Sequence, residues 1–477
     1  MHDESNLRYD VLVLGAGLAG SVAAYQLQQA GCRVGLIEAR TRVGGRVYTT
    51  YDWVAGQYAE LGPEFIDSNH LRVLGYAEQF GIPIRRRQNF WGISPMRESR
   101  RAMWEAWQRF WDAALHKAQL LSTKSRSIER FLKRLHRLDA LDQITMQDFA
   151  QQMGIWQDVA PHLIRYCRNL EAAEPNEVSM LSVIAQEAFY GAGVEQGAYR
   201  LEGGTQRLVE AMVATFQESG GTLMLETVAE AVEQTGRTVQ VHVRRHGQAR
   251  PLQARYLVIA LPLTLVRELE FRPPLSTERF RALQQLGVGQ VVKTLLQFRT
   301  RFWRQQAPRP LLLGASRSGM SDISAIWDET DIVPGEAGIL ALWVGGAPAR
   351  RWAHLTEAER IKRCLQTLET LYPGARQQLI KGVSLHWGQE PFAQLGYPFQ
   401  PPGLLTGGFP ALLNPEGRLY FAGDYLSLFV GYMEGALESG ERAAQAILKR
   451  LKRYTSKRDG RQNSTRKRGR ANADNEP

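Results

Sequence analysis

The spacing of hydrophobic positions near the start of the chain predicts a strand, a turn, a helix and a second strand over residues 9–38. Residues 11–14 are a short apolar run of the kind found in buried parallel strands. A second strand-like run covers residues 32–37 and ends at the acidic Glu38. This order is typical of the first crossover of a doubly wound α/β fold.

Farther along the chain the pattern becomes mostly helical over residues 71–199 and then β-rich. Strand-like runs at residues 222–228, 241–247 and 254–262 predict a return to the first sheet, with a boundary at Pro262. A second lobe is expected from about residue 271, including a helix from Glu357 that ends at LYPG. The alternation predicts discontinuous domains.

Within the helical region, Trp104, Trp107 and Trp111 fall at i, i+3 and i+7, beside Phe110. They therefore share one helix face. We expect that face to pack against neighbouring helices, because amphipathic spacing is what core-facing helices show. Contact with a substrate or a membrane is the alternative.

The turn after the first strand carries the G-x-G-x-x-G glycines Gly15, Gly17 and Gly20. In this motif the first glycine permits the turn, the second lets the backbone approach a pyrophosphate, and the third lets the helix pack on the strand. The helix N-terminus attracts the anion, and Glu38 can accept hydrogen bonds from a ribose. Glycines also mark ordinary turns, but here strand, helix, second strand and terminal acid coincide, which predicts a dinucleotide site.

A second phosphate-directed turn, R-x-G-G-R, follows with Arg42, Gly44, Gly45 and Arg46. Here the sequence resembles the flavin-containing amine oxidoreductases, and the likeness continues through ELGPEFIDSNH (residues 60–70), RLEGGTQRL (residues 200–208) and RLYFAGDYLSLFVGYMEGA (from residue 418). It covers nearly all of residues 9–448.

The resemblance implies an α/β fold, with a Rossmann-type FAD-binding domain interleaved with an α+β substrate domain. The FAD-binding domain would comprise residues 8–82, 199–274 and 404–449, and the substrate domain residues 83–198 and 275–403. Val228 would bond the adenine through its backbone, and Gly423 and Asp424 would meet the ribityl and pyrophosphate groups. The implied cofactor residues are Gly15, Gly17, Gly20, Glu38, Arg40, Gly44, Gly45, Arg46, Gly62, Phe65, Val228, Gly423, Asp424 and Met433.

The resemblance also implies three catalytic residues. Lys293 matches the lysine that holds a water near flavin N5, and its apolar neighbours predict a buried strand position. Tyr397 and Tyr432 match the two aromatic walls that flank the amine. Gly396 stands where members with covalently attached flavin have cysteine, so the FAD should be non-covalent.

Two positions bear on the substrate. Phe65 occupies the place of an arginine that grips the substrate carboxylate in L-amino-acid oxidases of the venom type. Glu64 and Asp67 resemble the carboxylates with which polyamine oxidases attract a second ammonium, although an acid after a Gly-Pro turn often only caps that turn. Both are therefore candidate substrate-binding residues.

These features predict an FAD-dependent oxidase of amines, including basic L-amino acids. A hydride would pass from the amine α-carbon to flavin N5, the imine would be hydrolysed, and oxygen would reoxidise the flavin to give hydrogen peroxide. An L-amino-acid oxidase is the alternative within the same chemistry. A desaturase or isomerase of apolar substrates and a non-catalytic flavin-loaded binding protein are alternatives from other classes, and Lys293 and Tyr432 argue against the desaturase.

The formal charge of +11 is concentrated in the last residues, since residues 449–477 carry +8 of it. The pI therefore describes a basic tail, residues 450–477, which we expect to be disordered, rather than a nucleic-acid-binding fold. A solubilising role is the simpler interpretation, with docking to an acidic surface as the alternative. Three scattered cysteines predict a reducing compartment and no metal site, and the absence of an apolar leader or span predicts a cytoplasmic or peripheral protein.

Overall fold

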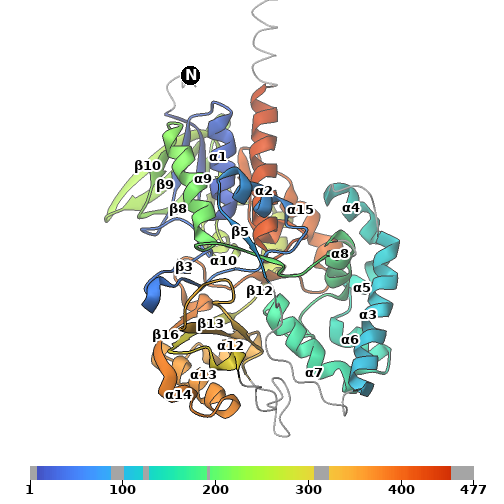
Figure 1. Ribbon diagram of the computed structural model, residues 1–477. Helices are drawn as coiled ribbons and strands as arrows, with labels where there is room; N and C mark the ends of the chain where they lie inside the picture. Colours follow the sequence, from blue (N-terminus) through green and yellow to red (C-terminus); the bar gives the residue numbers. More distant parts are fainter. Residues whose placement is uncertain (1–7, 88–100, 122–127, 191–193, 306–321, 453–477) are drawn as a thin grey trace, which may run out of the picture.

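A computed structural model describes residues 8–87, 101–121, 128–190, 194–305 and 322–452. Figure 1 shows a sheet with its helices at the upper left, a second sheet with helices below it, and a helical region on the right. The expected disorder of the basic tail concerns residues outside the described part, apart from 450–452.

The main sheet has eight strands in the order β11-β8-β9-β10-β1-β2-β7, with β18 also paired to β10. Its members come from three separated parts of the chain, as the discontinuous pattern predicts. β7, β2, β1, β10 and β18 run parallel, whereas β9 joins antiparallel to β8 and β10. The strands are β1 (Tyr9–Leu14), β2 (Val34–Ile37), β7 (Thr222–Met224), β8 (Thr227–Gln234), β9 (Val239–Arg245), β10 (Gln248–Ile259), β11 (Glu270–Arg272) and β18 (Leu419–Phe421).

The centre of this sheet is buried on both faces, which explains the apolar run at residues 11–14. Val11 and Val13 contact one hydrophobic cluster, and Leu12 and Leu14 contact the other. Successive side chains of a strand point to opposite faces, so one uninterrupted apolar strand serves both cores. Helices on the sheet are α1 (Leu18–Gln29), α2 (Leu71–Gln79), α9 (Gln206–Glu218) and the helix of residues 433–452.

Several predicted strand boundaries were wrong. The runs at residues 241–247 and 254–262 belong to strands of residues 239–245 and 248–259. The second strand begins at Val34 rather than at residue 32. The run at residues 222–228 is two strands rather than one, because Glu226 has a positive φ of 52° and breaks the extended backbone between β7 and β8. Alternation of side chains could not show this interruption, since it depends on a single backbone angle.

The second sheet is antiparallel, in the order β14-β15-β13-β16. Its central strand β13 is buried at every position, and helix α13 packs on it and on β16. The strands are β13 (Val291–Phe298), β14 (Ala325–Asp328), β15 (Gly338–Gly345) and β16 (Leu379–His386), and the helices are α12 (Ala347–Trp352), α13 (Glu357–Leu371) and α14 (Ala375–Gln378). The helix expected from Glu357 is confirmed, and it opens with a capping box between Thr356 and Glu359.

The helical region contains α3 (Arg101–Leu121), α4 (Ile128–Leu135), α5 (Asp139–Asp142), α6 (Met146–Gln152), α7 (Trp156–Tyr166) and α8 (Met180–Tyr190). Helix α3 packs against α7 and α8. Shorter elements complete the chain: the pairs β3 (Thr49–Thr50) with β4 (Ala59–Glu60), β5 (Ile84–Arg86) with β6 (Tyr199–Leu201) and β12 (Gly287–Val288) with β17 (Pro398–Phe399), and helices α10 (Leu263–Glu268), α11 (Thr277–Gln285) and α15 (Phe409–Leu413).

In the described residues, no helix combines the length and the apolar character that crossing a membrane requires. Cys32, Cys167 and Cys364 are all buried free thiols.

Candidate active site

A cavity of about 1250 Å³ lies where the main sheet, the second sheet and the helical region meet. This exceeds the usual range of about 300–1,000 Å³ for a site that holds one drug-sized ligand, so a dinucleotide and a second molecule can share it. Every cofactor residue predicted from the sequence lines the cavity except Gly20: Gly15, Gly17, Glu38, Arg40, Gly44, Gly45, Arg46, Gly62, Phe65, Val228, Gly423, Asp424 and Met433.

Two glycines of the first turn, Gly15 and Gly20, stand where no larger residue fits, whereas a Cβ on Gly17 would make only ordinary contact with the Gly44 carbonyl oxygen, at 3.8 Å. Gly15 has a positive φ of 93°, and a Cβ added to it would lie 2.7 Å from the Ala260 carbonyl oxygen. A Cβ on Gly20 would lie 1.8 Å from the Gly15 carbonyl oxygen, so Gly20 packs helix α1 against the turn after β1 without reaching the cavity. The turn is thus held open for a ligand at the N-terminus of α1.

Glu38 is placed at the end of β2 by two backbone donors. One carboxylate oxygen accepts from the Ala16 amide at 2.8 Å, and the other accepts from the Arg40 amide at 3.0 Å. The side chain is buried yet lines the cavity. Arg40 beside it pairs with Glu390, so its charge is already compensated.

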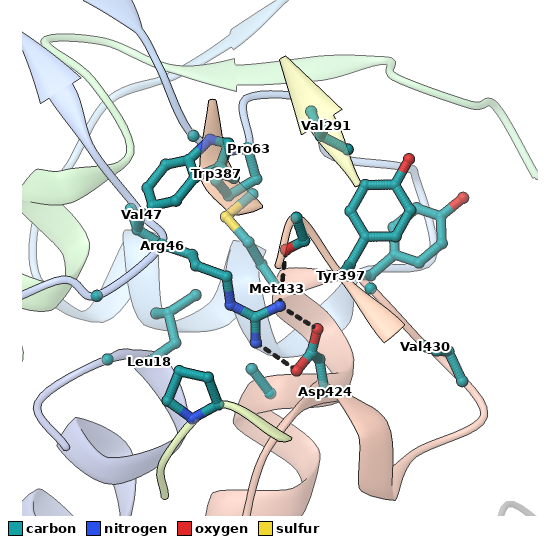
Figure 2. Close-up of a pocket in the computed structure, with 18 of the residues that line it drawn as sticks. Leu18, Arg46, Val47, Pro63, Val291, Trp387, Tyr397, Asp424, Val430 and Met433 are labelled. Carbon is teal, nitrogen blue, oxygen red and sulfur yellow. Dashed lines mark hydrogen bonds and ion pairs between the residues drawn. The ribbon is translucent and has the colours of Figure 1, made fainter. Parts of the chain in front are cut away.

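Arg46 and Asp424 join the two ends of the chain inside the cavity. The guanidinium donates to both carboxylate oxygens, at 2.5 and 2.9 Å, and also to the Gly396 carbonyl at 2.9 Å (Figure 2). Such a bidentate pair fixes both planes. Arg42 behaves differently from its predicted partner in R-x-G-G-R, because it does not line the cavity and instead donates to carbonyls of its own loop, including Gly45.

These residues fit an FAD. The α1 N-terminus and the glycine turns leave an uncovered backbone surface for a pyrophosphate, and Glu38 offers carboxylate oxygens at the ribose position. The segments that follow the first strand of the chain, β1, and the last, β18, both line this cavity, through Gly15 and Gly423, as a dinucleotide bound along its whole length requires.

Lys293 lies on β13 with 1 % of its surface exposed, as its apolar neighbours predicted. Its ammonium donates to Glu64 Oε2 at 2.7 Å and to the Gly62 carbonyl at 3.2 Å. The nitrogen also lies 5.1 Å from the centre of the Trp327 ring. Since an ammonium has three N–H donors and two acceptors are found among the described residues, one donor remains for a molecule in the cavity.

A buried ionic cluster surrounds this lysine. Arg200 Nη2 lies 3.7 Å from Glu64 and 2.9 Å from Glu329, while Glu329 Oε2 lies 3.9 Å from Lys293. Burial tends to raise the pKa of Glu64, but the charges of Lys293 and Arg200 outweigh it and lower that pKa. Burial, then the charge of Glu64, raise the pKa of Glu329 well above its ordinary value. The two cations therefore favour the anionic form of Glu64, whereas burial and the charge of Glu64 favour the protonated form of Glu329.

Tyr397 and Tyr432 both line the cavity, on separate segments that meet at Gly431. The Tyr397 hydroxyl donates to the Asn169 carbonyl at 2.6 Å, and its ring stacks on Trp343 with centroids 6.2 Å apart. The Tyr432 ring lies edge-on to His70, at 5.3 Å. Burial raises the pKa of Tyr397 well above its ordinary value, so the phenol stays neutral.

Gly396 has no room for a side chain. A Cβ at this position would lie 2.5 Å from Cγ2 and 2.8 Å from Cβ of Val291, which is fully buried on β13. Figure 2 shows Val291 beside Tyr397 on this wall of the cavity. A cysteine at residue 396 would thus require the strand or the valine to move.

The two candidate substrate carboxylates are already engaged by the protein. Glu64 faces Lys293 and Arg200, as described above. Asp67 accepts from the Gly197 amide at 2.5 Å and lies 3.5 Å from His70, and burial raises its pKa to about 6. Both line the cavity, so their contact with substrate stays a prediction. Phe65 packs between Trp327 and the Arg87 guanidinium.

The tryptophan stripe does more than the packing we expected from its spacing. Phe110 is fully buried, and Trp107 and Trp111 pack on Tyr166 with ring centroids 6.1 and 5.2 Å apart. However, all three tryptophans also line the cavity, and Trp104 is 44 % exposed. The stripe therefore packs against a neighbouring helix, as expected, and also faces the cavity, while its contact with a substrate stays a prediction.

Sequence reasoning also missed the residues that the helices bring to this wall. His162 and Tyr166 of α7, and Glu187 of α8, line the same cavity, and the rings of His162 and Tyr166 contact Trp107. Helix α7 contributes three cavity residues, His162, Arg165 and Tyr166, but helical spacing does not distinguish a cavity-lining face from a packed one, and Glu187 stands alone on α8. The tryptophan stripe was the one available indication.

Comparison with known proteins identifies the family of the chain. The family description "Flavin containing amine oxidoreductase" matches residues 18–448. The human protein named amine oxidase [flavin-containing] B is 28 % identical over 468 residues, covering 92 % of this chain and 86 % of that protein. The probable flavin-containing monoamine oxidase A of Dictyostelium discoideum is 25 % identical over 477 residues, covering 93 % of this chain and 98 % of that protein.

Solved structures agree on the fold. Cyclohexylamine oxidase from Brevibacterium oxydans superposes with a TM-score of 0.76 at 23 % identity, covering 93 % of this chain and 100 % of that chain. Putrescine oxidase bound to putrescine gives 0.76 at 20 % identity, covering 93 % and 99 %. The predicted α/β fold with FAD-binding and substrate domains is confirmed, whereas the residue limits of those domains stay predictions.

Proposed function

The chain belongs to the flavin-containing amine oxidoreductase family, and on that premise we propose that it is an FAD-dependent oxidase of amines that uses oxygen as its electron acceptor. Membership makes it an FAD flavoprotein and an oxidoreductase acting on CH–NH2 donors. The oxidase proposal rests on one observation: the dinucleotide turn, a buried lysine and two tyrosines line one cavity.

When bound, FAD supplies the acceptor for a hydride from the amine α-carbon and passes the electrons on to oxygen as hydrogen peroxide. The α1 N-terminus would receive its pyrophosphate, Glu38 its ribose and the Val228 backbone its adenine. The Arg46–Asp424 pair would be the contact for the ribityl and pyrophosphate region. With Gly396 in place of a cysteine, we propose that the cofactor is held without a covalent bond.

Tyr397 and Tyr432 would hold the reacting amine between aromatic walls. Because the Tyr397 hydroxyl is tied to the Asn169 carbonyl and its ring to Trp343, the orientation of this wall is set before substrate binds. Aromatic faces accept an ammonium or the N–H groups of a neutral amine, a contact of about 0.5–2 kcal/mol. The rings thereby orient the α-carbon without acid–base chemistry of their own.

Lys293 would hold a water with its remaining N–H donor and present positive charge inside the cavity. We assign Glu64 to this lysine rather than to the substrate, because the 2.7 Å ion pair is buried and needs its anion. Glu64 is then a positioning residue that acts through Lys293. Asp67 remains a candidate substrate contact.

A peroxide assay with a panel of primary, secondary and diamines and basic L-amino acids tests the proposal. Purified enzyme should release peroxide with at least one amine, and the same amine should bleach the flavin without air. If no amine bleaches the flavin, the amine-oxidase proposal fails. If an amine bleaches it but air does not restore the colour, the protein is a dehydrogenase and the oxygen-dependent half of the proposal fails.

A further inference from the structure

Beyond the two tyrosines, the cavity continues between three helices. Trp107 and Trp111 of α3 line this part, and the ring of Tyr166 of α7 contacts both of them. Glu187 of α8 lines the same cavity. Leu115, also a lining residue, is 42 % exposed, so this arm of the cavity reaches the surface along α3. A substrate whose amine lies between Tyr397 and Tyr432 would extend into this arm.

In the described part of the chain, no cation is paired with Glu187, the acid of this arm. Among the described residues Glu187 has no hydrogen-bond or ion-pair partner, although it is only partly exposed. The charge of Glu187 acts on two nearby groups, Tyr166 and the buried Glu171, and raises the pKa of each; neither group is a cation. Arg165, the cation that also lines the cavity here, already interacts with the protein. A half-buried carboxylate without a counter-charge is costly unless a ligand supplies one.

We propose that Glu187, together with the indole faces of Trp107 and Trp111, binds a second cationic group of the substrate. The preferred substrates are then amines that carry an ammonium or guanidinium at a distance from the reacting nitrogen. This inference rests on the amine-oxidase function proposed above and adds its substrate class.

Aromatic faces and a carboxylate are the combination that selects a cation over a neutral chain. The indole rings attract positive charge through their π electrons and also cover the methylene groups that lead to it. The negative charge of the carboxylate distinguishes a cationic group from a neutral one. Burial raises the pKa of Glu187 because it disfavours the anion, and a bound cation would favour the anion again. Glu64 and Asp67, the acids that the sequence pointed to, have protein partners, so Glu187 is the one whose partner is missing.

The test compares α,ω-diamines of four to eight carbons with monoamines of equal length. The readout is the ratio of kcat/KM for the diamine to kcat/KM for the monoamine, measured by peroxide release at low ionic strength. Glu187→Gln should lower this ratio at least tenfold, and added salt should lower it in the wild type. The matched control is Glu218→Gln, an exposed residue at the end of α9 that does not line the cavity, and it should keep the ratio within twofold.

Glu187→Lys keeps the inference testable if the amide folds poorly, with flavin content as the check on folding. Reversing the charge should shift preference toward amines with a distal carboxylate, such as ω-amino acids. A ratio unchanged by both variants, or a wild type that prefers monoamines, would overturn the inference while leaving the amine oxidase intact. A wild type whose flavin no amine reduces would instead remove the function on which the inference rests.

Discussion

Replacing Glu64 by glutamine tests whether this carboxylate acts through Lys293. The amide is nearly isosteric but uncharged, so Lys293 loses its partner at 2.7 Å, and the next carboxyl is Glu329 at 3.9 Å. Burial and the charge of Glu64 raise the pKa of Glu329, so removing the charge of Glu64 should lower that pKa and favour the Glu329 anion.

The size of the effect follows from the two distances. At an effective dielectric constant of about 20, the attraction falls from about 6 kcal/mol at 2.7 Å to about 4 kcal/mol at 3.9 Å. If this whole difference of about 2 kcal/mol entered the barrier, Glu64→Gln would slow flavin reduction or reoxidation by about 30-fold, which is therefore the upper limit. Lys293→Met removes the ammonium outright and should slow flavin reduction, reoxidation or both by at least about tenfold, which is about 1.4 kcal/mol.

Stopped-flow spectroscopy should separate the half-reactions, with reduction followed under anaerobic conditions and reoxidation followed on mixing with air. All variants should retain FAD. The double variant Glu64→Gln, Lys293→Met should be no slower than Lys293→Met within about twofold, because residues that act as one unit are not additive. Lys381→Met is the matched control, because it removes a partly exposed lysine that lies on the neighbouring strand β16 and pairs with Asp52, and it should leave both rates unchanged.

The reasoning would be refuted if Glu64→Gln slowed the Lys293→Met enzyme by the same factor as it slows the wild type. Glu64 would then act independently of the lysine. A loss confined to the KM of diamines would return Glu64 to the substrate-binding role that the sequence suggested.

Three further predictions concern the cofactor and the tail. Acid precipitation should leave the yellow colour in the supernatant, because Gly396 offers no thiol, and colour in the pellet would contradict non-covalent FAD. Gly396→Ala should weaken FAD retention or stability by about 1–3 kcal/mol through its overlap with Val291, and Val291→Ala should restore part of the loss in the double variant, with purely additive losses counting against the steric account. Deleting residues 452–477 should leave flavin content and turnover unchanged, since the cavity residues end at Ala436, and lost flavin would show that the tail belongs to the fold.

The local sequence was sufficient to predict the first crossover and its nucleotide turn. Tyr9–Leu14 is apolar at almost every position because the strand serves two cores, and Gly15 and Gly20 are fixed by contacts within a few ångströms of the turn. The apolar run and the turn glycines are local residue types that carry this information, even though the carbonyl that Gly15 approaches belongs to the distant Ala260. Lys293 was recognisable for a similar reason, since a lysine within an apolar strand requires a buried partner.

Only the tertiary structure decided which residue is the buried partner of Lys293 and which acid remains available to a substrate. The sequence singled out Glu64 and Asp67, but residues far away in the chain, Lys293, Arg200 and Gly197, occupy them. Glu187 gave no signal, because an acid in a helix is ordinarily a solvated one, and its place in the cavity depends on how α8 packs beside α3. Electrostatic roles depend on distances across the fold, and these are set by packing between elements rather than by the pattern within any one of them.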